Sequence, residues 1–137
     1  MAFNTTVRSV MKWTDDVSGQ TEELAIEYTL SSVILSKKRI GTSDNSGWDT
    51  LYDASVENMD PGDAPFGFAI KVTSAAAAVL KITDDAAAVT YVNIAAGQGY
   101  MIGGDVHGST ATARIEQIDI QAKTATDCKY EWIVQHD

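Results

Sequence analysis

The sequence predicts an all-β fold: an antiparallel two-layer β-sandwich or jelly-roll-like domain of about eight or nine strands with little helix. Three observations lead to this prediction. The chain holds 11 Val, 11 Ile and 14 Thr but only 5 Leu, and β-branched side chains suit strands. Apolar and polar residues alternate in two segments, Leu24 to Leu30 and Cys128 to Val134. Most of the 13 Asp stand in turn-like clusters between apolar segments.

The chain is expected to form one domain over residues 1–137, because it contains no linker-like stretch and no internal repeat. Its formal net charge of -9 argues against nucleic acid as a partner, since a face that binds a duplex needs clustered Lys and Arg. No apolar run is long enough to cross a bilayer, and the first residues lack the apolar core of a signal peptide. Neither a membrane span nor secretion is therefore expected.

The N-terminal part is expected to hold two strands. Phe3 to Trp13 is predicted as the first strand, followed by a turn over Thr14 to Gln20. From Leu24 to Leu30 the apolar residues fall at every second position, which is typical of a strand with one buried face. The pattern is less regular from Ser31 to Ile40, where three aliphatic residues are consecutive, and this indicates a bend, a bulge or a strand buried on both faces.

The longest irregular excursion is expected from Gly41 to Pro65. This stretch is rich in Gly, Ser, Asp and Asn and holds both prolines of the chain, and only residues 48–52 favour a short strand. Long loops in small domains are often functional. The excursion is therefore the first place to look for a binding segment.

The second half of the chain is expected to consist of short strands separated by turns, the spacing typical of a sandwich or barrel. The predicted strands are Phe66 to Thr73, Ala78 to Thr83, Ala88 to Ile94, Gly99 to Gly103, Ala111 to Ala122 and Cys128 to Gln135. Two short helices remain as alternatives by propensity, at Ser74 to Ala78 and at Glu22 to Glu27.

No residue pattern indicates catalysis, a cofactor or a metal. Gly-x-Ser-x-Gly is absent, and Gly97-Gln-Gly99 lacks the full phosphate-binding pattern and is better explained as a hairpin turn. Asp44, Asn45 and Asp49 surround Gly47 without the spacing of a calcium loop. The single cysteine, Cys128, begins an amphipathic strand, where a buried inert thiol is expected. The sequence predicts that the protein is not an enzyme.

Three aromatic residues are candidate anchors at an interface with a partner. Trp48 and Tyr52 lie in the irregular excursion, and Phe66 follows it directly. Buried aromatic side chains contribute much of the binding energy of protein interfaces. Local packing within the loop is the alternative role for Trp48.

The only basic run of this acidic chain is formed by Lys37, Lys38 and Arg39. Charged residues of this kind protect an edge strand against sheet-to-sheet aggregation. The functional alternative is a docking patch for an acidic partner surface.

The C-terminal half resembles small structural proteins of bacteriophage particles. The resemblance rests on Val79-Leu-Lys-Ile-Thr-Asp-Asp85, on Val89 to Gly104 with the turn Ile94-Ala-Ala-Gly97, and on Ile115-Glu-Gln-Ile-Asp-Ile120. In that class, a strand ending in a similar turn leads to another strand and then to a closing strand with alternating aliphatic residues. The first 65 residues do not contribute to the resemblance.

This resemblance implies a virion protein, assembled in the host cytoplasm, that works through its surfaces and not through a catalytic site. A capsid decoration (cement) protein is the first expectation, and a tail or head-fibre module is the second. The partners implied are the major capsid protein or other virion proteins, with a homo-oligomer, preferably a trimer, as the binding form.

A glycan-binding β-sandwich is the competing hypothesis from another class. Such a site combines an exposed aromatic platform with polar side chains that bond sugar hydroxyls. Trp48 with Asp44, Asn45 and Asp49 could supply both.

Overall fold

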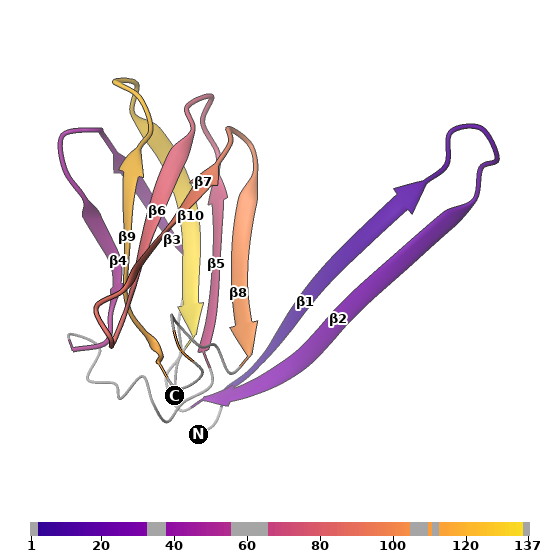
Figure 1. Ribbon diagram of the computed structural model, residues 1–137, viewed down its shortest axis with the longest axis horizontal. Coiled ribbons are helices and arrows are strands. Elements are labelled where there is room, and N and C mark those ends of the chain that lie inside the picture. The colour runs from indigo at the N-terminus through magenta and orange to yellow at the C-terminus, as the bar shows by residue number, and fades with distance from the viewer. Residues whose placement is uncertain (1–2, 33–37, 56–65, 105–109, 111–112, 136–137) are drawn as a thin grey trace.

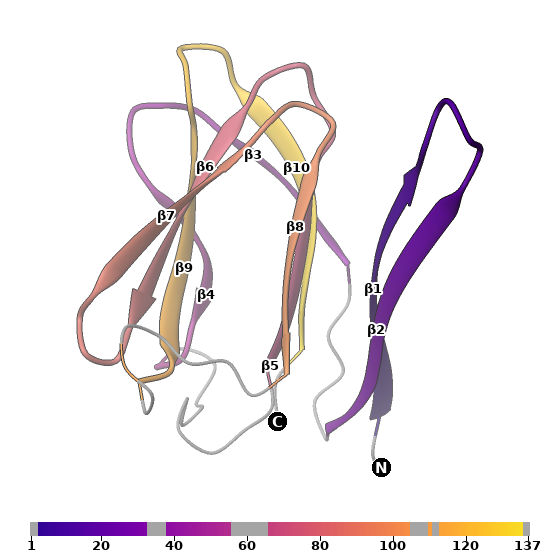
Figure 2. The ribbon, with the colours of Figure 1, turned by 45° about the vertical axis from the view of Figure 1, so that its right-hand side comes forward.

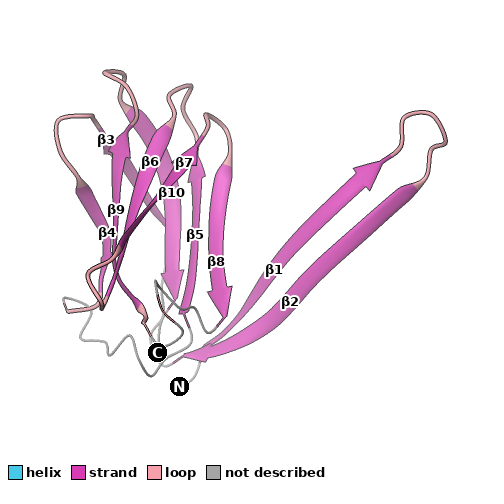
Figure 3. Ribbon diagram, in the orientation of Figure 1, coloured by secondary structure: helices cyan, strands magenta, loops and turns pink. Residues whose placement is uncertain are grey.

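The computed structural model describes residues 3–32, 38–55, 66–104, 110 and 113–135, and every regular element in this part of the chain is a strand (Figure 3). The strands are β1 (Phe3–Thr14), β2 (Thr21–Ser32), β3 (Arg39–Ser43), β4 (Asp49–Asp53), β5 (Phe66–Val72), β6 (Ala78–Asp84), β7 (Val89–Ile94), β8 (Gly99–Gly104), β9 (Ile115–Ala122) and β10 (Cys128–Gln135). The predicted all-β fold is confirmed, with ten described strands where about eight or nine were expected.

Two four-stranded antiparallel sheets pack face to face as a sandwich (Figure 1). Their strand orders are β3-β10-β5-β8 and β4-β9-β6-β7. One hydrophobic core fills the space between them, because the inward side chains of both sheets belong to a single cluster. Its largest fully buried members include Phe68 from the first sheet and Leu80, Ile118 and Ile120 from the second.

The alternation predicted at the C-terminus is confirmed in β10. Cys128, Tyr130 and Val134 are buried, whereas Lys129 is exposed. β10 pairs with β3 on one side and with β5 on the other. Its inward face therefore lies at the centre of the first sheet.

The stretch predicted as an irregular excursion is more regular than expected. β3 extends to Ser43, and β4 pairs with β9 through a register shift between Thr50 and Tyr52. Such a shift lets the consecutive residues Leu51 and Tyr52 both turn inward, and both are buried. Residues 56–65 of the predicted excursion lie outside the described residues.

Neither helical alternative is present. Glu22 to Glu27 belongs to β2, and Ser74 to Ala77 forms a turn that leads into β6 at Ala78. Between β2 and β3, residues 33–37 lie outside the described residues, so the irregular pattern there stays a prediction.

β1 and β2 form a separate two-stranded sheet that projects from the sandwich (Figures 1 and 2). The two strands pair continuously from Phe3 opposite Ser32 to Thr14 opposite Thr21. The alternation from Leu24 to Leu30 predicted a buried face, and this was wrong at Leu24 and Ile26, which are 65% and 56% exposed. The physical reason is that the pattern specifies a strand with an apolar face, while no described strand covers that face.

Candidate functional site

The projecting hairpin carries its apolar side chains on one face. Cross-strand partners share a face of a sheet, and Met11 pairs with Leu24, while Ser9 pairs with Ile26. The apolar hairpin face, as the term is used below, consists of Val7, Met11, Trp13, Leu24 and Ile26. Met11 is the most exposed member at 76%, and only Val7, near the base, is half-buried.

The opposite face of the hairpin is mostly polar and carries cross-strand charge pairs. Arg8 lies opposite Glu27, with 3.9 Å between Arg8 Nε and Glu27 Oε2, and Lys12 lies opposite Glu23. Charged side chains interact favourably with water on this face. One face of the hairpin is therefore apolar and the other is polar. This is the pattern of a β-ribbon that packs against another surface through one face only.

The turn at the tip of the hairpin is held by hydrogen bonds. The Asp15 carboxylate accepts one from the backbone N–H of Val17 at 2.8 Å, and Gly19 donates its N–H to the Asp15 carbonyl at 2.8 Å. The Val17 and Ser18 hydrogen bonds lower the pKa of Asp15 below its usual value. Gly19 has a φ of 72°, which glycine adopts without strain. The tip is thus preformed.

A pocket of about 360 Å³ separates the base of the hairpin from the first sheet. On the hairpin side it is lined by Thr6, Val7 and Arg8. The sheet side is lined by apolar residues and glycine, namely Gly67, Phe68, Ala69, Met101, Ile102 and Ile133. The hairpin and the first sheet therefore present apolar atoms to each other without closing the space between them.

The outer face of the first sheet continues this apolar surface. Met101, Ala69 and Ile133 lie in one row across β8, β5 and β10. A shallower pocket of about 200 Å³ adjoins the first one, shares Ala69 and Ile133 with it, and is also lined by Lys38, Lys71 and Glu131. We call these two adjoining pockets the sheet furrow.

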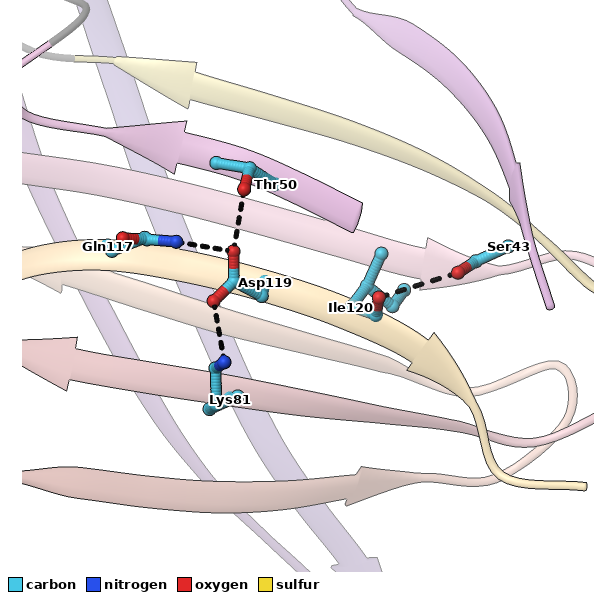
Figure 4. Close-up of polar contacts among 6 residues, drawn as sticks. All are labelled: Ser43, Thr50, Lys81, Gln117, Asp119 and Ile120. Carbon is cyan, nitrogen blue, oxygen red and sulfur yellow. Dashed lines mark hydrogen bonds and ion pairs between the residues drawn. The ribbon is translucent and has the colours of Figure 1, made fainter. Parts of the chain in front are cut away.

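The outer face of the second sheet carries a buried carboxylate (Figure 4). Asp119 is 1% exposed, and its Oδ1 accepts hydrogen bonds from Thr50 Oγ1 and Gln117 Nε2, each at 2.8 Å. Its Oδ2 lies 3.3 Å from Lys81 Nζ. The neighbouring Ser43 donates its hydroxyl proton to Asp49 Oδ2 at 2.5 Å, and the Ile120 carbonyl oxygen lies 3.4 Å from the same hydroxyl oxygen. A paired and hydrogen-bonded carboxylate such as Asp119 is a structural group.

Trp48 covers the Lys81 side of this network. Lys81 Nζ lies 4.8 Å from the centre of the Trp48 ring, a cation–π contact. The ring of Tyr91 lies 6.1 Å from that of Trp48, tilted by 37°. Trp48 is 37% exposed and Tyr91 is 61% exposed. The two rings form the exposed aromatic pair of this sheet face.

The structure separates the three aromatic residues predicted as partner contacts. Trp48 lies on the surface but also packs within its own chain, whereas Tyr52 is 1% exposed in the core. Tyr52 is therefore not a surface anchor, because the register shift in β4 turns its ring inward. Phe66 begins β5, and its side chain lies outside the described residues.

The basic run lies at the entrance to an edge strand. Arg39 begins β3, which is the outermost strand of its sheet, and Lys38 Nζ lies 3.6 Å from Glu131 Oε1. This is the position expected of a residue that protects an edge. Lys37 lies outside the described residues. Lys38 also lines the sheet furrow, so its docking role stays open.

Two of the polar residues suggested for glycan binding, Asp44 and Asp49, accept hydrogen bonds in and beside the turn between β3 and β4. The Ser46 hydroxyl and backbone N–H donate to Asp44 at 2.6 Å and 2.8 Å and lower the pKa of Asp44. Asp49 accepts from Ser43, and the backbone carbonyl of Asn45 accepts from Gln121 Nε2 at 3.1 Å. The Asp44 and Asp49 carboxylates therefore stabilise this turn.

Two observations on the described residues concern metal binding and thiol chemistry. No group of three or more His, Cys, Asp or Glu side chains among them is placed to hold a metal ion. Cys128 is fully buried, and burial raises the pKa of its thiol, which disfavours the reactive thiolate. None of the elements in the described ranges is a helix long and apolar enough to cross a membrane.

Sequence reasoning missed the apolar hairpin face as a candidate site. The available signal was the turn from Thr14 to Gln20 between two long alternating segments, which indicates a hairpin. Comparison with known proteins adds no assignment, since no protein-family model matches the chain and no curated protein matches it.

Proposed function

We propose that this chain is a structural subunit of a bacteriophage particle, and that the β1–β2 hairpin is the arm by which it associates. The observation that carries the association role is the apolar hairpin face, whose outer members are about half to three quarters exposed. Contiguous exposed apolar side chains often mark an interaction site on a protein. Its assignment to a phage particle rests on the sequence resemblance of residues 79–120.

The hairpin geometry supports an association role on energetic grounds. A two-stranded ribbon is at best marginally stable in water and needs an apolar face packed against something else. β1 and β2 pair only with each other among the described strands. Because the tip is already held by the Asp15 hydrogen bonds, less conformational entropy is lost on docking.

Within the phage particle, capsid decoration is the first role we propose, and a tail or head-fibre module is the second. A decoration protein binds repeatedly across the head, so it is present in proportion to the major capsid protein. A tail or fibre module is present in few copies. The number of copies per purified particle separates the two roles.

The test is to add the purified protein to particles of the parent phage that lack it and to count bound copies by quantitative mass spectrometry. We expect binding by the parent protein and loss of binding in Met11→Ser/Leu24→Ser. The matched control is Lys12→Ser/Glu23→Ser, which alters the adjacent cross-strand pair on the polar face without changing net charge. Absence of parent binding, or equal binding by both variants, contradicts the proposal.

The Trp48 and Tyr91 pair favours glycan binding as a second candidate function. Exposed rings of this kind can stack on sugar faces, although the Asp44 and Asp49 carboxylates already accept hydrogen bonds within their own chain. A glycan array tests it with Tyr91→Ala, because Trp48 also packs over Lys81. The control is Val89→Ala, which changes another exposed side chain of β7. A signal that Tyr91→Ala abolishes and Val89→Ala retains supports this function, and no signal from the parent rejects it.

A further inference from the structure

We propose that the outer half of the hairpin of one copy lies in the sheet furrow of a second copy of this chain. The inference rests on the proposed function, because it specifies how the subunit associates. Three properties of the furrow carry it: its apolar floor, its charge and its length.

The apolar floor of the furrow matches the apolar hairpin face. Met101, Ala69 and Ile133 form a row on the outer surface of β8, β5 and β10. Gly67 has no side chain to fill the adjoining pocket. Met11 and Leu24, paired across the hairpin, are the exposed side chains available to enter it.

The charges of the two surfaces are complementary. The hairpin, residues 3–32, carries two basic and five acidic side chains, with Asp15, Asp16 and Glu22 at or beside its tip. The outer face of the first sheet carries Lys71 and Lys129 on β5 and β10, with Lys38 beside Glu131. The acidic tip therefore favours the lysine end of the furrow, and such complementarity fixes orientation as well as speeding association.

The dimensions of the two surfaces also agree. From Met11 to Asp15 the hairpin extends about 14 Å, and the three strand separations from β8 to β3 also span about 14 Å. With Met11 beside Met101, the tip of the hairpin reaches the edge where Lys38 lies. In this arrangement the apolar part of the hairpin lies on the apolar part of the furrow, and the acidic tip lies beside the lysine side chains.

We assign the furrow to the hairpin of a second copy because each hairpin projects away from the first sheet of its own chain. Among the hairpin side chains that the structure describes, those of residues 6–8 at its base line the pocket of their own chain, and the ribbon diverges from the sandwich toward its tip (Figure 1). The contact joins two different surfaces, so repeated contacts close into a ring when the rotation allows it. A trimeric ring agrees with the oligomer that the resemblance to virion proteins implies.

Disulfide trapping between two variants, each with one cysteine added to the native Cys128, tests this contact in the full chain. Leu24→Cys places a thiol on the apolar hairpin face, and Met101→Cys places one in the furrow. The native Cys128 is fully buried and does not compete. We expect mild oxidation of an equal mixture to give a covalent pair containing one chain of each variant. The control is Glu23→Cys with Met101→Cys, which moves the thiol to the neighbouring residue on the polar face and is expected to give no such pair.

Two results of this experiment overturn the inference. One is equal trapping by Glu23→Cys and Leu24→Cys, since it shows no preference for the apolar face. The other is a disulfide within a single chain carrying both Leu24→Cys and Met101→Cys, together with no linked pair in the mixture, since it shows that the hairpin folds back onto its own sheet.

The charge component has its own measurement. We expect Lys71→Glu to weaken self-association by about tenfold at low salt, and Glu22→Lys added in the same chain to restore part of it. If Lys71→Glu leaves self-association unchanged at low salt, the proposed orientation is wrong.

Failure of this inference is distinguishable from failure of the proposed function. A monomer that binds phage particles contradicts the contact between copies and leaves the virion role standing. An oligomer that is trapped as described but does not bind particles supports the contact and contradicts the virion role.

Discussion

Gly41 is the residue that gives the Tyr130 ring its place in the core. A Cβ added at Gly41 would lie 2.6 Å from Tyr130 Cε2, closer than packed carbon atoms approach. We expect Gly41→Ala to lower the free energy of unfolding by about 1–3 kcal/mol, the usual cost of overpacking. Gly47→Ala is the control, because a Cβ there meets nothing within 4 Å. Denaturant unfolding measures both, and equal stability of the two variants contradicts the packing described.

Tyr130 itself makes stability depend on alkaline pH. Burial raises the pKa of Tyr130 to about 12, while an unfolded tyrosine titrates near pH 10. The unfolded state therefore loses the Tyr130 proton first, so Tyr130 leaves the free energy of unfolding nearly unchanged below pH 10 and lowers it as the pH rises from about 10 to about 12.

The expected loss is about 2 kcal/mol, measured by denaturant unfolding at about pH 9 and about pH 11.5. Burial also raises the pKa of Cys128, so the thiol contributes to the same decline. The comparison of the parent with Tyr130→Phe isolates the tyrosine. A decline of equal size in both proteins contradicts the role assigned to Tyr130.

Lys81 neutralises the buried Asp119. Lys81→Met removes the charge partner 3.3 Å from Asp119 Oδ2, and we expect a loss of about 3 kcal/mol in the free energy of unfolding. Adding Asp119→Asn in the same chain removes the uncompensated charge and should recover part of that loss. A double variant whose loss equals the sum of the two single losses shows that the pair is not coupled.

At the scale of elements, the hairpin and the sandwich differ in what their apolar residues stabilise. Leu24 on the hairpin is 65% exposed, whereas Leu80 in β6 is fully buried. In dilute protein, we expect Leu24→Ala to change the free energy of unfolding by less than about 0.5 kcal/mol, and Leu80→Ala to lower it by about 3–5 kcal/mol. The same chemical change is made at both sites. A large loss at Leu24 in a monomer would show that the hairpin face is covered within its own chain.

The accuracy of the sequence predictions also varied by element. Alternation identified β2 and β10 equally well, because a period of two reports only that a strand has two unlike faces. The prediction that the apolar face is buried was correct for β10 and wrong for β2. The topology, not the alternation, determines which element covers a face. β3 was not predicted as a strand, because its last residues begin a stretch rich in turn-forming residues. The inward orientation of Tyr52 was not predicted either, because it depends on a register shift that residue types do not specify.

At the scale of the whole molecule, composition was enough to predict the sandwich but not its projecting arm. The excess of Val and Ile indicates sheets, and the turn clusters indicate several short strands. Composition does not specify whether a hairpin joins a neighbouring sheet, and in the structure Thr6, Val7 and Arg8 at its base line a pocket between the hairpin and the first sheet. The candidate site, the apolar hairpin face, was therefore identified from the structure. None of the aromatic residues chosen from the sequence lies on it.

The molar mass of the protein in solution, measured by size-exclusion chromatography with light scattering over a range of concentrations, tests the central claim most directly. The account predicts a parent mass that is a multiple of 14.7 kDa, with three chains favoured. Met11→Ser/Leu24→Ser is predicted to elute as a folded monomer of 14.7 kDa, while Lys12→Ser/Glu23→Ser keeps the parent mass. A parent that remains at the monomer mass at every concentration, or a Met11→Ser/Leu24→Ser variant that keeps the oligomer mass, contradicts it.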